Sequence, residues 1–515
     1  MGLINDAGLE SFHEIIGCKL KGSKDILNKT MEKATTVSTV AFMLRNGSIK
    51  SMKLLTGDAV DKWNERFERI AAIESEIATF LTPESEDMKA IQSDTFGQLS
   101  FNDDMFKCLN IFPFVLWTIA LYKIWVVPVF AISTPIVAWI LPYIFLKFMY
   151  RLPITQEQYG EIIKMVWSGN PLDIKNTLKN GFAPKQSMFT TRFIIQSIFM
   201  TASFIQSLVQ PIQNAMHLYK TDLNIIKNGS KIIELRKLYD TLKSECKENN
   251  IKILLRNSLS NIPEDPRIAI RLLIDEPERF KICMNDLAEM EILWRISQSK
   301  ILKQAHIFET GGPLLKGSKL YDISLGISGV PSSVSFSNAI NHAVLTGPNG
   351  GGKSSFLRAI LQAVLIGQSY GVAPADNLMM RRFGWISSGL RLQDAPGNLS
   401  MFETEVWFAA NLLKKKDLRG SPGLVLYDEL FHSTNPPDGV RTAEKFLTRL
   451  WKSTDVLSIV STHVFSLVKK APASVKRLCC KADFDKKGDI QYKFNVEEGV
   501  CTISSVNSIW RRFKL

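Results

Sequence analysis

One stretch of the chain, Leu345-Thr-Gly-Pro-Asn-Gly-Gly-Gly-Lys-Ser-Ser355, constrains the fold and the chemistry more tightly than any other. From Gly347 to Ser354 it fits the pattern G-x-x-x-x-G-K-[ST]. Residues 343–345 before it are apolar and partly β-branched, and residues 356–361 after it have helical spacing. The sequence therefore predicts a strand, a glycine-rich loop and a helix, an arrangement that binds phosphate through loop N–H groups and the helix N-terminus.

Phosphate binding gives the residues of this loop separate roles. Lys353 would reach the β- and γ-phosphates of a nucleotide, and the hydroxyl of Ser354 would ligate Mg²⁺. The expected nucleotide-binding residues are Gly347, Pro348, Asn349, Gly350, Gly351, Gly352, Lys353, Ser354 and Ser355. A plain glycine-rich turn is the alternative, but it does not explain a Lys-Ser pair at this offset between two suitable flanks.

Two apolar strands downstream end in polar residues that suit the same chemistry. Residues 423–427 lead into Asp428 and Glu429, which we expect to ligate Mg²⁺ and to orient and deprotonate an attacking water, respectively. Residues 456–460 lead into Ser461-Thr-His463, so His463 would lie where it can sense the γ-phosphate. The alternatives are a carboxylate pair without a ligand and a histidine of the core or surface.

The chain has 515 residues, which is too long for one compact core and predicts several domains. The fold class we expect is an α/β P-loop ATPase domain at the C-terminus, preceded by a mostly α-helical half with a helical lever arm and a transmembrane segment or hairpin. The expected boundaries are 1–105 for an N-terminal helical region, 106–151 for the transmembrane segment, 152–310 for a helical core and lever arm, and 311–515 for the ATPase domain.

Composition narrows the compartment and the partners. The net charge of +13 is compatible with nucleic acid or an anionic membrane surface, but the basic residues are spread along the chain. Seven cysteines without a C-x-x-C pair argue against a disulfide framework or a zinc site and indicate a reducing compartment. The first residues have neither a basic start nor an apolar core, so we expect no signal peptide and an intracellular protein.

The most apolar part of the chain is residues 109–146, in which Lys123 carries the one charge. Residues 124–146 form an uncharged run of 23, about 35 Å of helix at ~1.5 Å per residue, which is enough to span a bilayer. We therefore predict membrane insertion with the ATPase domain in the cytoplasm. Basic residues flank both ends, so charge does not give the orientation.

Three prolines leave the form of this membrane segment open. Pro128, Pro135 and Pro142 recur every seven residues, and Ser133-Thr134-Pro135 could make a turn. One tilted span and a re-entrant or two-helix hairpin are both consistent with the pattern, and a buried core helix pair is the soluble alternative. Residues 193–209 are apolar with spaced Gln and Ser, and we expect a packed helix there rather than a second span. Residues 217–305 indicate a solvated helical arm.

Five motifs in order resemble the MutS family of mismatch-repair ATPases. Thr346-Gly-Pro-Asn-Gly-Gly-Gly-Lys-Ser354 is similar to that family's T-G-P-N-M-G-G-K-S, and residues 366–375 are loosely similar to I-G-x-x-x-V-P-A. Ser400-Met-Phe-Glu-Thr-Glu405 resembles S-T-F-M-V-E, residues 428–439 resemble D-E-I-G-R-G-T-S-T-x-D-G, and Ser461-Thr-His463 resembles A-T-H. The resemblance covers about residues 311–510.

The resemblance implies an ABC-type, Mg²⁺-dependent ATPase whose two copies sandwich ATP and whose helical arms move on DNA. Within one copy the acting residues would be Lys353, Ser354, Asp428, Glu429 and His463. Asn349 would lie near the phosphates, and Ser400 would be offered across the homodimer to the γ-phosphate. Residues 431–433, Phe-His-Ser, replace the family's Gly-Arg-Gly, and residues 329–336 lack its adenine-binding residues.

Mismatch recognition does not follow from the resemblance. Phe12-His13-Glu14 has the aromatic and the glutamate that mismatch-sensing proteins insert into DNA, but no recognisable domain surrounds it, and we interpret it as structural. We expect a membrane-tethered ATPase acting on DNA. The alternatives are a membrane-bound mechanochemical ATPase acting on protein partners, a soluble repair protein, and an ABC transporter ATPase, whose L-S-G-G-Q motif the sequence lacks.

Overall fold

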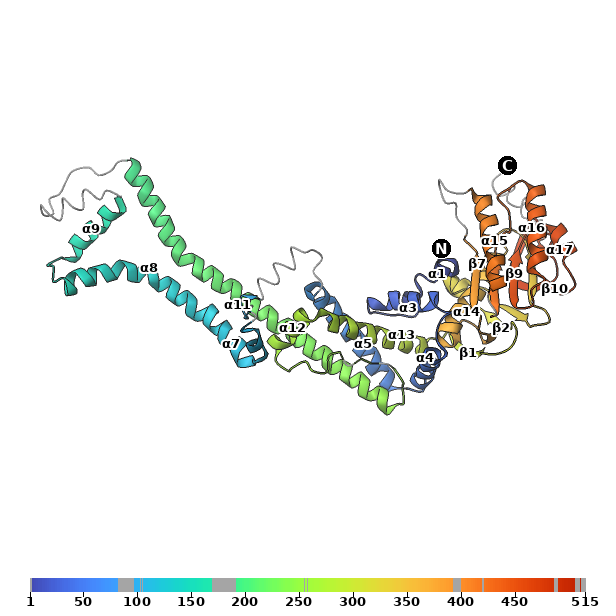
Figure 1. The fold of residues 1–515 in the computed structure, drawn as a ribbon, viewed down its shortest axis with the longest axis horizontal. Coiled ribbons are helices and arrows are strands. Elements are labelled where there is room, and N and C mark those ends of the chain that lie inside the picture. The colour runs from blue at the N-terminus through green and yellow to red at the C-terminus, as the bar shows by residue number, and fades with distance from the viewer. Residues whose placement is uncertain are drawn as a thin grey trace. The chain divides into compact units, whose positions relative to one another are not determined.

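The computed structural model describes residues 2–81, 97–101, 103, 105–168, 191–253, 255–256, 258–391, 400–418, 421–485, 490–504 and 510. The chain divides into two compact units, each built from separate stretches of sequence. The first unit contains residues 1–72, 238–257 and 281–515, and the second contains residues 73–237 and 258–280. Figure 1 labels their helices and strands.

The centre of the first unit is a six-stranded sheet in the order β11-β10-β4-β9-β8-β7. The strands are β4 (His342–Thr346), β7 (Trp385–Gly389), β8 (Gly423–Tyr427), β9 (Val456–Ser461), β10 (Val475–Phe484) and β11 (Ile490–Glu498). All neighbours are parallel except the antiparallel edge strand β11. Every residue of β4, β8 and β9 is buried, as their mostly apolar sequences predict for a parallel sheet covered on both faces.

Helices connect these strands, which confirms a mixed α/β domain at the C-terminus. They are α14 (Lys353–Tyr370), α15 (Met401–Leu418), α16 (Pro436–Leu450) and α17 (Phe465–Lys470). A second sheet in the same unit has the order β3-β2-β6-β1-β5. Its strands are β1 (Lys303–Phe308), β2 (Leu315–Leu320), β3 (Ser332–Phe336), β5 (Val372–Ala373) and β6 (Asn377–Arg381), with the short helix η4 (Ile323–Ser328) after β2.

The N-terminal helices belong to this same unit. They are α1 (Leu3–Ala7), α2 (Phe12–Ile15), α3 (Gly22–Glu32), α4 (Thr39–Met52) and the start of α5 (Asp58–Leu81). The buried carboxylate of Glu291, in α13 (Pro277–Gln298), accepts hydrogen bonds from the backbone N–H groups of Lys19 at 2.7 Å and Leu20 at 3.0 Å and from the Ser23 hydroxyl at 2.9 Å. A buried charge is stable only with such partners, so this contact ties the N-terminal segment to the rest of the unit.

Phe12 lies in the core that these helices form. Its side chain is 1% exposed, and a residue that inserts between base pairs has to be displayed on a surface. The structural interpretation of the Phe12-His13-Glu14 motif is confirmed.

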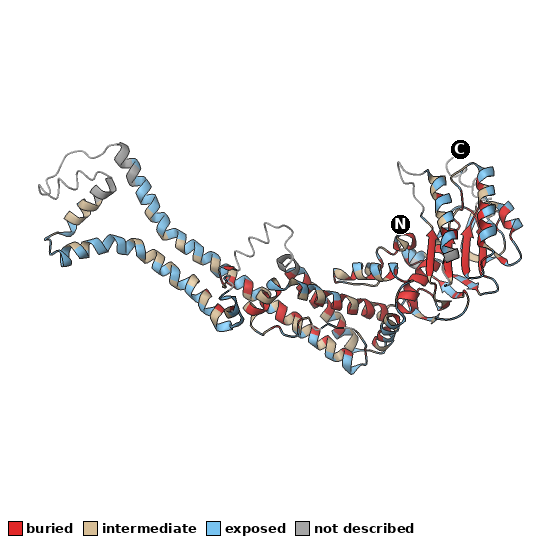
Figure 2. Cartoon of the chain, viewed as in Figure 1, coloured by how far each residue is buried: buried red, intermediate tan, exposed pale blue. Residues whose placement is uncertain are grey.

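The second unit contains a long apolar helical stretch. It runs through α7 (Pro113–Leu121), a π-helical turn at Tyr122–Val126, α8 (Val127–Ile144) and a second π turn at Phe145–Met149. In the part of the chain that the structure describes, this is the one helix long and apolar enough to cross a membrane by length and composition. In its most apolar window only 6% of the residues are buried, so the buried-core alternative is wrong. Figure 2 shows how exposed α8 is.

The turn expected at Ser133-Thr134-Pro135 does not form, so a hairpin folded within residues 106–151 is wrong. Helix α8 continues through Pro135 and Pro142. The hydroxyls of Ser133 and Thr134 each donate a hydrogen bond to the carbonyl of Phe130 at 2.8 Å. Apolar helices tolerate proline where local π-type adjustments help to satisfy the freed backbone groups, and π turns flank α8 at Tyr122–Val126 and Phe145–Met149.

The other elements of the second unit are helical. They are η1 (Lys107–Ile111), α9 (Gln156–Ser168), α12 (Pro266–Asp275) and most of α11 (Thr191–Glu248), which continues into the first unit at residue 238. Of the described residues of α11 from 198 to 221, none is buried. The expectation of a packed helix at residues 193–209 is therefore wrong for the residues whose burial is described. Further along, Gly229 lets α11 touch α12, because a Cβ there would meet the carbonyl oxygen of Pro266 at 1.9 Å.

Candidate active site

The glycine-rich loop joins β4 to α14 as the sequence predicts, and its backbone requires glycine. Gly347, Gly350 and Gly352 have φ angles of 155°, 77° and 95°. A Cβ on Gly347 would also lie 2.9 Å from the Cβ of Cys480 in β10. Side chains are strained at such positive φ angles, so these glycines allow the tight turn that begins α14.

Lys353 is the first residue of α14 and is 5% exposed. Its ammonium group donates hydrogen bonds to the carbonyl oxygens of Gly347 at 3.1 Å and Pro348 at 3.2 Å. Both carbonyls belong to the glycine-rich loop, so the loop backbone surrounds the Lys353 ammonium group. This is the position from which a lysine can contact phosphate oxygens as a point charge.

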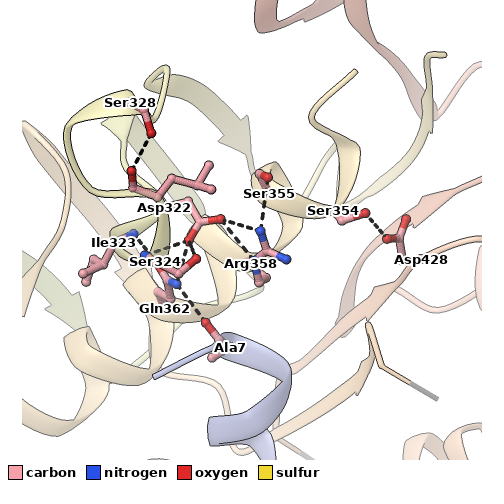
Figure 3. Close-up of polar contacts among 11 residues, drawn as sticks. Ala7, Asp322, Ile323, Ser324, Ser328, Ser354, Ser355, Arg358, Gln362 and Asp428 are labelled. Atoms are coloured by element: carbon pink, nitrogen blue, oxygen red, sulfur yellow. Dashed lines mark hydrogen bonds and ion pairs between the residues drawn. The ribbon is translucent and has the colours of Figure 1, made fainter. Parts of the chain in front are cut away.

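Asp428 follows β8 and joins two other elements of the site. One carboxylate oxygen accepts a hydrogen bond from the Ser354 hydroxyl, as Figure 3 shows, and the other accepts one from the Ser461 hydroxyl at the end of β9. The Ser461 oxygen in turn accepts a hydrogen bond from the backbone N–H of Glu429 at 2.9 Å. Hydroxyl and carboxylate oxygens are the donors that Mg²⁺ takes from proteins, so Ser354 and Asp428 fit the predicted metal site.

Glu429 and His463 lie together as predicted. His463 Nε2 is 3.3 Å from Glu429 Oε1, and both side chains are partly exposed. Glu429 has a φ of 53°, a conformation uncommon for a residue other than glycine. The hydrogen bond with His463 is the main cause that lowers the pKa of Glu429 below its usual value. The carboxylate is therefore ionised at neutral pH, the form that a general base requires.

Ser400 is not brought to the loop within one copy of the chain. It begins α15, where its hydroxyl and its backbone N–H donate to the carboxylate of Glu403 at 2.8 and 2.9 Å. The Glu403 N–H returns a hydrogen bond to the Ser400 hydroxyl at 3.3 Å. This reciprocal pattern is a capping box, and it leaves the Ser400 side chain on an exposed surface.

A cavity of about 430 Å³ opens beside the loop. Residues 349–356 and Glu429 line its polar side, and Leu325, Val330 and Phe494 contribute apolar side chains. The volume is in the usual range of small-ligand sites, which combine apolar walls with a few polar groups. The sequence identified no residue for the base of a nucleotide, because residues 329–336 lack the family's adenine-binding residues. Phe494 of β11, far from the loop in the chain, lines the cavity.

A buried polar network below the cavity was not predicted. Arg358 in α14 donates to Asp322 at 3.1 Å and to the Ser355 hydroxyl at 3.2 Å. Gln362, one turn further, donates to Asp322 at 3.0 Å and to the carbonyl of Ala7 at 2.8 Å (Figure 3). The loop helix is thereby joined both to the segment that lines the cavity and to the N-terminal helix α1.

His432 and Ser433, two of the residues that differ from the family pattern after Asp428, both contact Glu405. His432 Nδ1 lies 3.0 Å from a carboxylate oxygen of Glu405, and the Ser433 hydroxyl donates to the other oxygen at 2.5 Å. Glu405 is buried in α15. Two of the motifs quoted for the resemblance, residues 400–405 and 428–439, are therefore in contact.

Comparisons with known proteins agree with the five motifs. Residues 343–509 match the family model of MutS domain V. The chain is 32% identical over 189 residues to the mitochondrial DNA mismatch repair protein MSH1 of Arabidopsis thaliana, a match that covers 34% of this chain and 16% of that protein. It is 32% identical over 197 residues to DNA mismatch repair protein MSH3 of Pyricularia oryzae, covering 37% of this chain and 16% of that protein.

A bacterial relative shows the same extent of similarity. The DNA mismatch repair protein MutS of Streptococcus pyogenes is 25% identical over 172 residues, which cover 33% of this chain and 20% of that protein. The chain thus spans about a fifth or less of the length of these relatives. Residues 343–509 match MutS domain V, the ATPase-domain region of MutS proteins, and the predicted resemblance to the MutS family is confirmed.

Proposed function

We propose that the chain is a Mg²⁺-dependent ATPase that converts ATP and water to ADP and phosphate at an interface between two copies. The observation that carries this proposal is the junction at Asp428, whose carboxylate is held by Ser354 of the loop helix and by Ser461 of β9. It brings the loop, the strand-end carboxylates and the β9 motif to one edge of the sheet, beside the cavity.

Each group at this edge has a task in phosphoryl transfer. Lys353 balances the charge of the β- and γ-phosphates, and Asn349 with the N–H groups of residues 350–355 surrounds them. Mg²⁺ bound by Ser354 and Asp428 would neutralise charge on the phosphate oxygens. Glu429 accepts the proton of the attacking water, and His463 holds that carboxylate in place while facing the γ-phosphate.

The second copy supplies the part of the site that one chain lacks. Ser400 lies on an exposed helix start with its hydroxyl directed to Glu403. The MutS resemblance gives this position to the γ-phosphate of the partner's nucleotide. Helix N-termini bind anions, so α15 can approach a phosphate across a homodimer.

Helical arms would transmit the closure of this dimer. Helix α11 contains 58 residues, or roughly 87 Å at ~1.5 Å per residue, and connects the two units. The net charge of +13 and the mismatch-repair names of the relatives support DNA as the partner of the arms. A membrane-bound mechanochemical ATPase acting on protein partners is the second candidate, favoured by the exposed apolar helix Pro113–Met149.

We further propose that residues 106–151 attach the protein to a membrane, with residues 152–310 as the helical core and lever arm and residues 311–515 as the ATPase domain in the cytoplasm. Leu116, Ala120 and Ile124 are buried, but no residue from 125 to 150 is. The exposed part coincides with the uncharged run 124–146, whose length suits a bilayer.

Two substitutions test the ATPase. Lys353→Ala removes the phosphate contact and should abolish ATP binding, whereas Glu429→Gln should bind ATP normally and lose turnover by 100-fold or more, about 2.7 kcal/mol of barrier. Glu444→Gln, an exposed glutamate of α16 paired with Lys470, is the matched control and should behave as wild type. Binding is measured with a fluorescent nucleotide and turnover by phosphate release. Wild-type turnover in Glu429→Gln would remove the assignment of the base.

A further inference from the structure

The N-terminal helices and the nucleotide domain form one compact unit, and this restricts how the chain can cross a membrane. Glu291 holds Lys19 and Leu20, and Gln362 of the loop helix holds Ala7. Residues 1–72 and 281–515 must therefore lie on the same side of any bilayer that the chain crosses between them.

A chain whose two ends lie on the same side crosses an even number of times. The helix through α8 would supply one crossing, so the return has to occur between residue 150 and the end of the second unit's main stretch at residue 237. Within that interval, residues 193–219 form an uncharged run of 27 between Arg192 and Lys220. At ~1.5 Å per residue this is about 40 Å of helix, longer than the ~30 Å hydrocarbon core.

We propose that residues 193–219 of α11 are a second membrane span, antiparallel to α8, so that the two helices form a hairpin and residues 150–168 lie on the face of the membrane opposite the ATPase domain. This inference rests on the proposed membrane attachment of residues 106–151. It assigns the lipid bilayer as the occupant of the exposed apolar surfaces of both helices.

The side chains of α11 are sorted as a second span requires. Ser207, Gln210, Pro211, Asn214 and Leu218 share one face of the helix and line a cavity of about 650 Å³ together with residues of the first helix, among them Lys123, Val127 and Ala131. Nearer the far end, the rings of Phe204 and Trp139 lie 5.8 Å apart. Polar side chains of membrane helices face a neighbouring helix in this way.

The opposite surface of α11 carries its large apolar side chains. The exposed residues are Ile195, Ile198, Phe199, Ile205, Val209, Ile212 and Met216. Soluble helices bury such residues, because exposing them to water is unfavourable. Figure 2 shows that this half of α11 is as exposed as α8. The Gln, Ser and Asn residues make the run less apolar than α8, and among the described residues Pro113–Met149 alone has the composition of a span, but the polar residues of the cavity face the first helix rather than lipid.

Basic residues mark both ends of the hairpin. Lys123 and Lys220 bound the two uncharged runs at the end near the helical core, and Lys147 and Arg192 bound them at the other. The Lys123 ammonium donates a hydrogen bond to the carbonyl of Gln98, outside the apolar helix, at 2.5 Å. Long basic side chains extend from membrane helices to the interface in this manner.

Protease protection in sealed membrane vesicles with the ATPase domain outward tests this topology. One protease recognition sequence is inserted after Arg151, an exposed residue, and another after Leu515, in the otherwise full-length chain. We expect the C-terminal site to be cleaved at once and the site after Arg151 to be cleaved only when detergent opens the vesicles. Equal cleavage of both sites in sealed vesicles would overturn the hairpin.

A pair of substitutions in α11 identifies the segment that returns. Ile205 and Leu223 are exposed to a similar extent, 54% and 47%, but only Ile205 lies in the uncharged run. Ile205→Lys should expose the site after Arg151 to protease in a large fraction of the molecules, because a charge at mid-membrane opposes insertion, and Leu223→Lys should leave it protected. Protection unchanged in both variants would show that another segment crosses.

Alkaline carbonate extraction and ATP turnover separate failure of this inference from failure of the proposals beneath it. A chain that resists extraction but exposes both protease sites contradicts the hairpin alone. A chain that carbonate releases contradicts membrane attachment and the hairpin together, and dimers cross-linked through α11 would then identify a second copy as the cover of its apolar face. Loss of ATP turnover in Glu429→Gln is measured independently of either result.

Discussion

Ser461 donates a hydrogen bond from its hydroxyl to Oδ1 of Asp428. The same hydroxyl oxygen accepts the backbone N–H of the next residue, Glu429, at 2.9 Å. One side chain of β9 thus fixes the predicted metal ligand and the start of the unusual turn, with a positive φ, that directs the predicted base. The MutS pattern A-T-H that this segment resembles has alanine at this position, which has no hydroxyl.

The first prediction concerns this hydroxyl. Ser461→Ala should lower ATP turnover about three- to tenfold and leave ATP binding unchanged, since a hydrogen bond contributes about 1 kcal/mol and a tenfold rate change is about 1.4 kcal/mol. Phosphate release at saturating ATP measures the effect. Ser244→Ala, which removes an exposed hydroxyl of α11, is the control. Wild-type turnover in Ser461→Ala would show that Asp428 and Glu429 hold their positions without it.

The sequence predicted the framework of this site well. A strand, a glycine loop and a helix have periodicities that determine them locally, and the ends of parallel strands meet at one edge of a sheet. These two facts bring Lys353, Ser354, Asp428, Glu429 and His463 together. In the motif Ser461-Thr-His463 the sequence assigned a role to the histidine alone. The contacts of Ser461 depend on one side-chain oxygen, and no sequence periodicity reveals such a contact.

The sequence did not predict which distant segments pack together, for a different reason. An amphipathic helix shows which of its faces is buried but does not name its partner, so the attachment of residues 1–72 to α13 and α14 could not be read from the pattern. For the same reason, the sequence pattern could not show that Phe494 lines the cavity. Pro135 after Ser133 and Thr134 is compatible with a turn and with a continuing apolar helix, so the sequence pattern alone did not exclude the turn.

The second prediction separates the two roles of Ser400. Ser400→Ala should destabilise the start of α15 by about 0.5–2 kcal/mol and abolish ATP-dependent dimers, whereas Ser400→Asn should keep the cap and still lose the dimers. Sedimentation in the Glu429→Gln background, with and without ATP, measures association, and thermal unfolding measures stability. Dimers of normal strength in Ser400→Asn would contradict a contribution of this hydroxyl across the interface.

The third prediction tests the metal ligands. Asp428→Asn removes the one negative charge that the proposed protein ligands offer Mg²⁺ and should raise the Mg²⁺ concentration for half-maximal turnover at least tenfold, and chelation by EDTA should stop turnover in the wild type. Titration of MgCl₂ at constant ATP gives both values. Asp438→Asn, in the exposed first turn of α16, serves as the matched control. An unchanged Mg²⁺ requirement in Asp428→Asn would reject the ligand assignment.

The fourth prediction concerns DNA. We expect weak, salt-sensitive binding with little preference for a mismatch, because the basic residues are dispersed and Phe12 is enclosed in the core. Titration of matched and mismatched duplexes at two salt concentrations with ATP measures both properties. A tenfold preference for the mismatch, about 1.4 kcal/mol, would contradict the structural interpretation of Phe12.

The fifth prediction follows from the same burial. Phe12→Ala should lower the free energy of unfolding of the first unit by about 3–5 kcal/mol, the usual cost of removing a buried phenyl ring. Ile15→Ala, three residues on and exposed, should change stability by less than about 0.5 kcal/mol. Urea unfolding followed by tryptophan fluorescence distinguishes the two, and equal midpoints would place Phe12 outside the core.

The contact of Glu291 with Lys19, Leu20 and Ser23 also sets an order of events during synthesis. The first 72 residues leave the ribosome without Glu291, because residues 73–280, of which only 238–257 belong to the same unit, are made before residues 281–515. At roughly 5–20 residues per second this delay is about 10–40 s. Both long apolar runs are synthesised during this delay, so with the proposed membrane attachment they would reach the bilayer before the nucleotide domain is made.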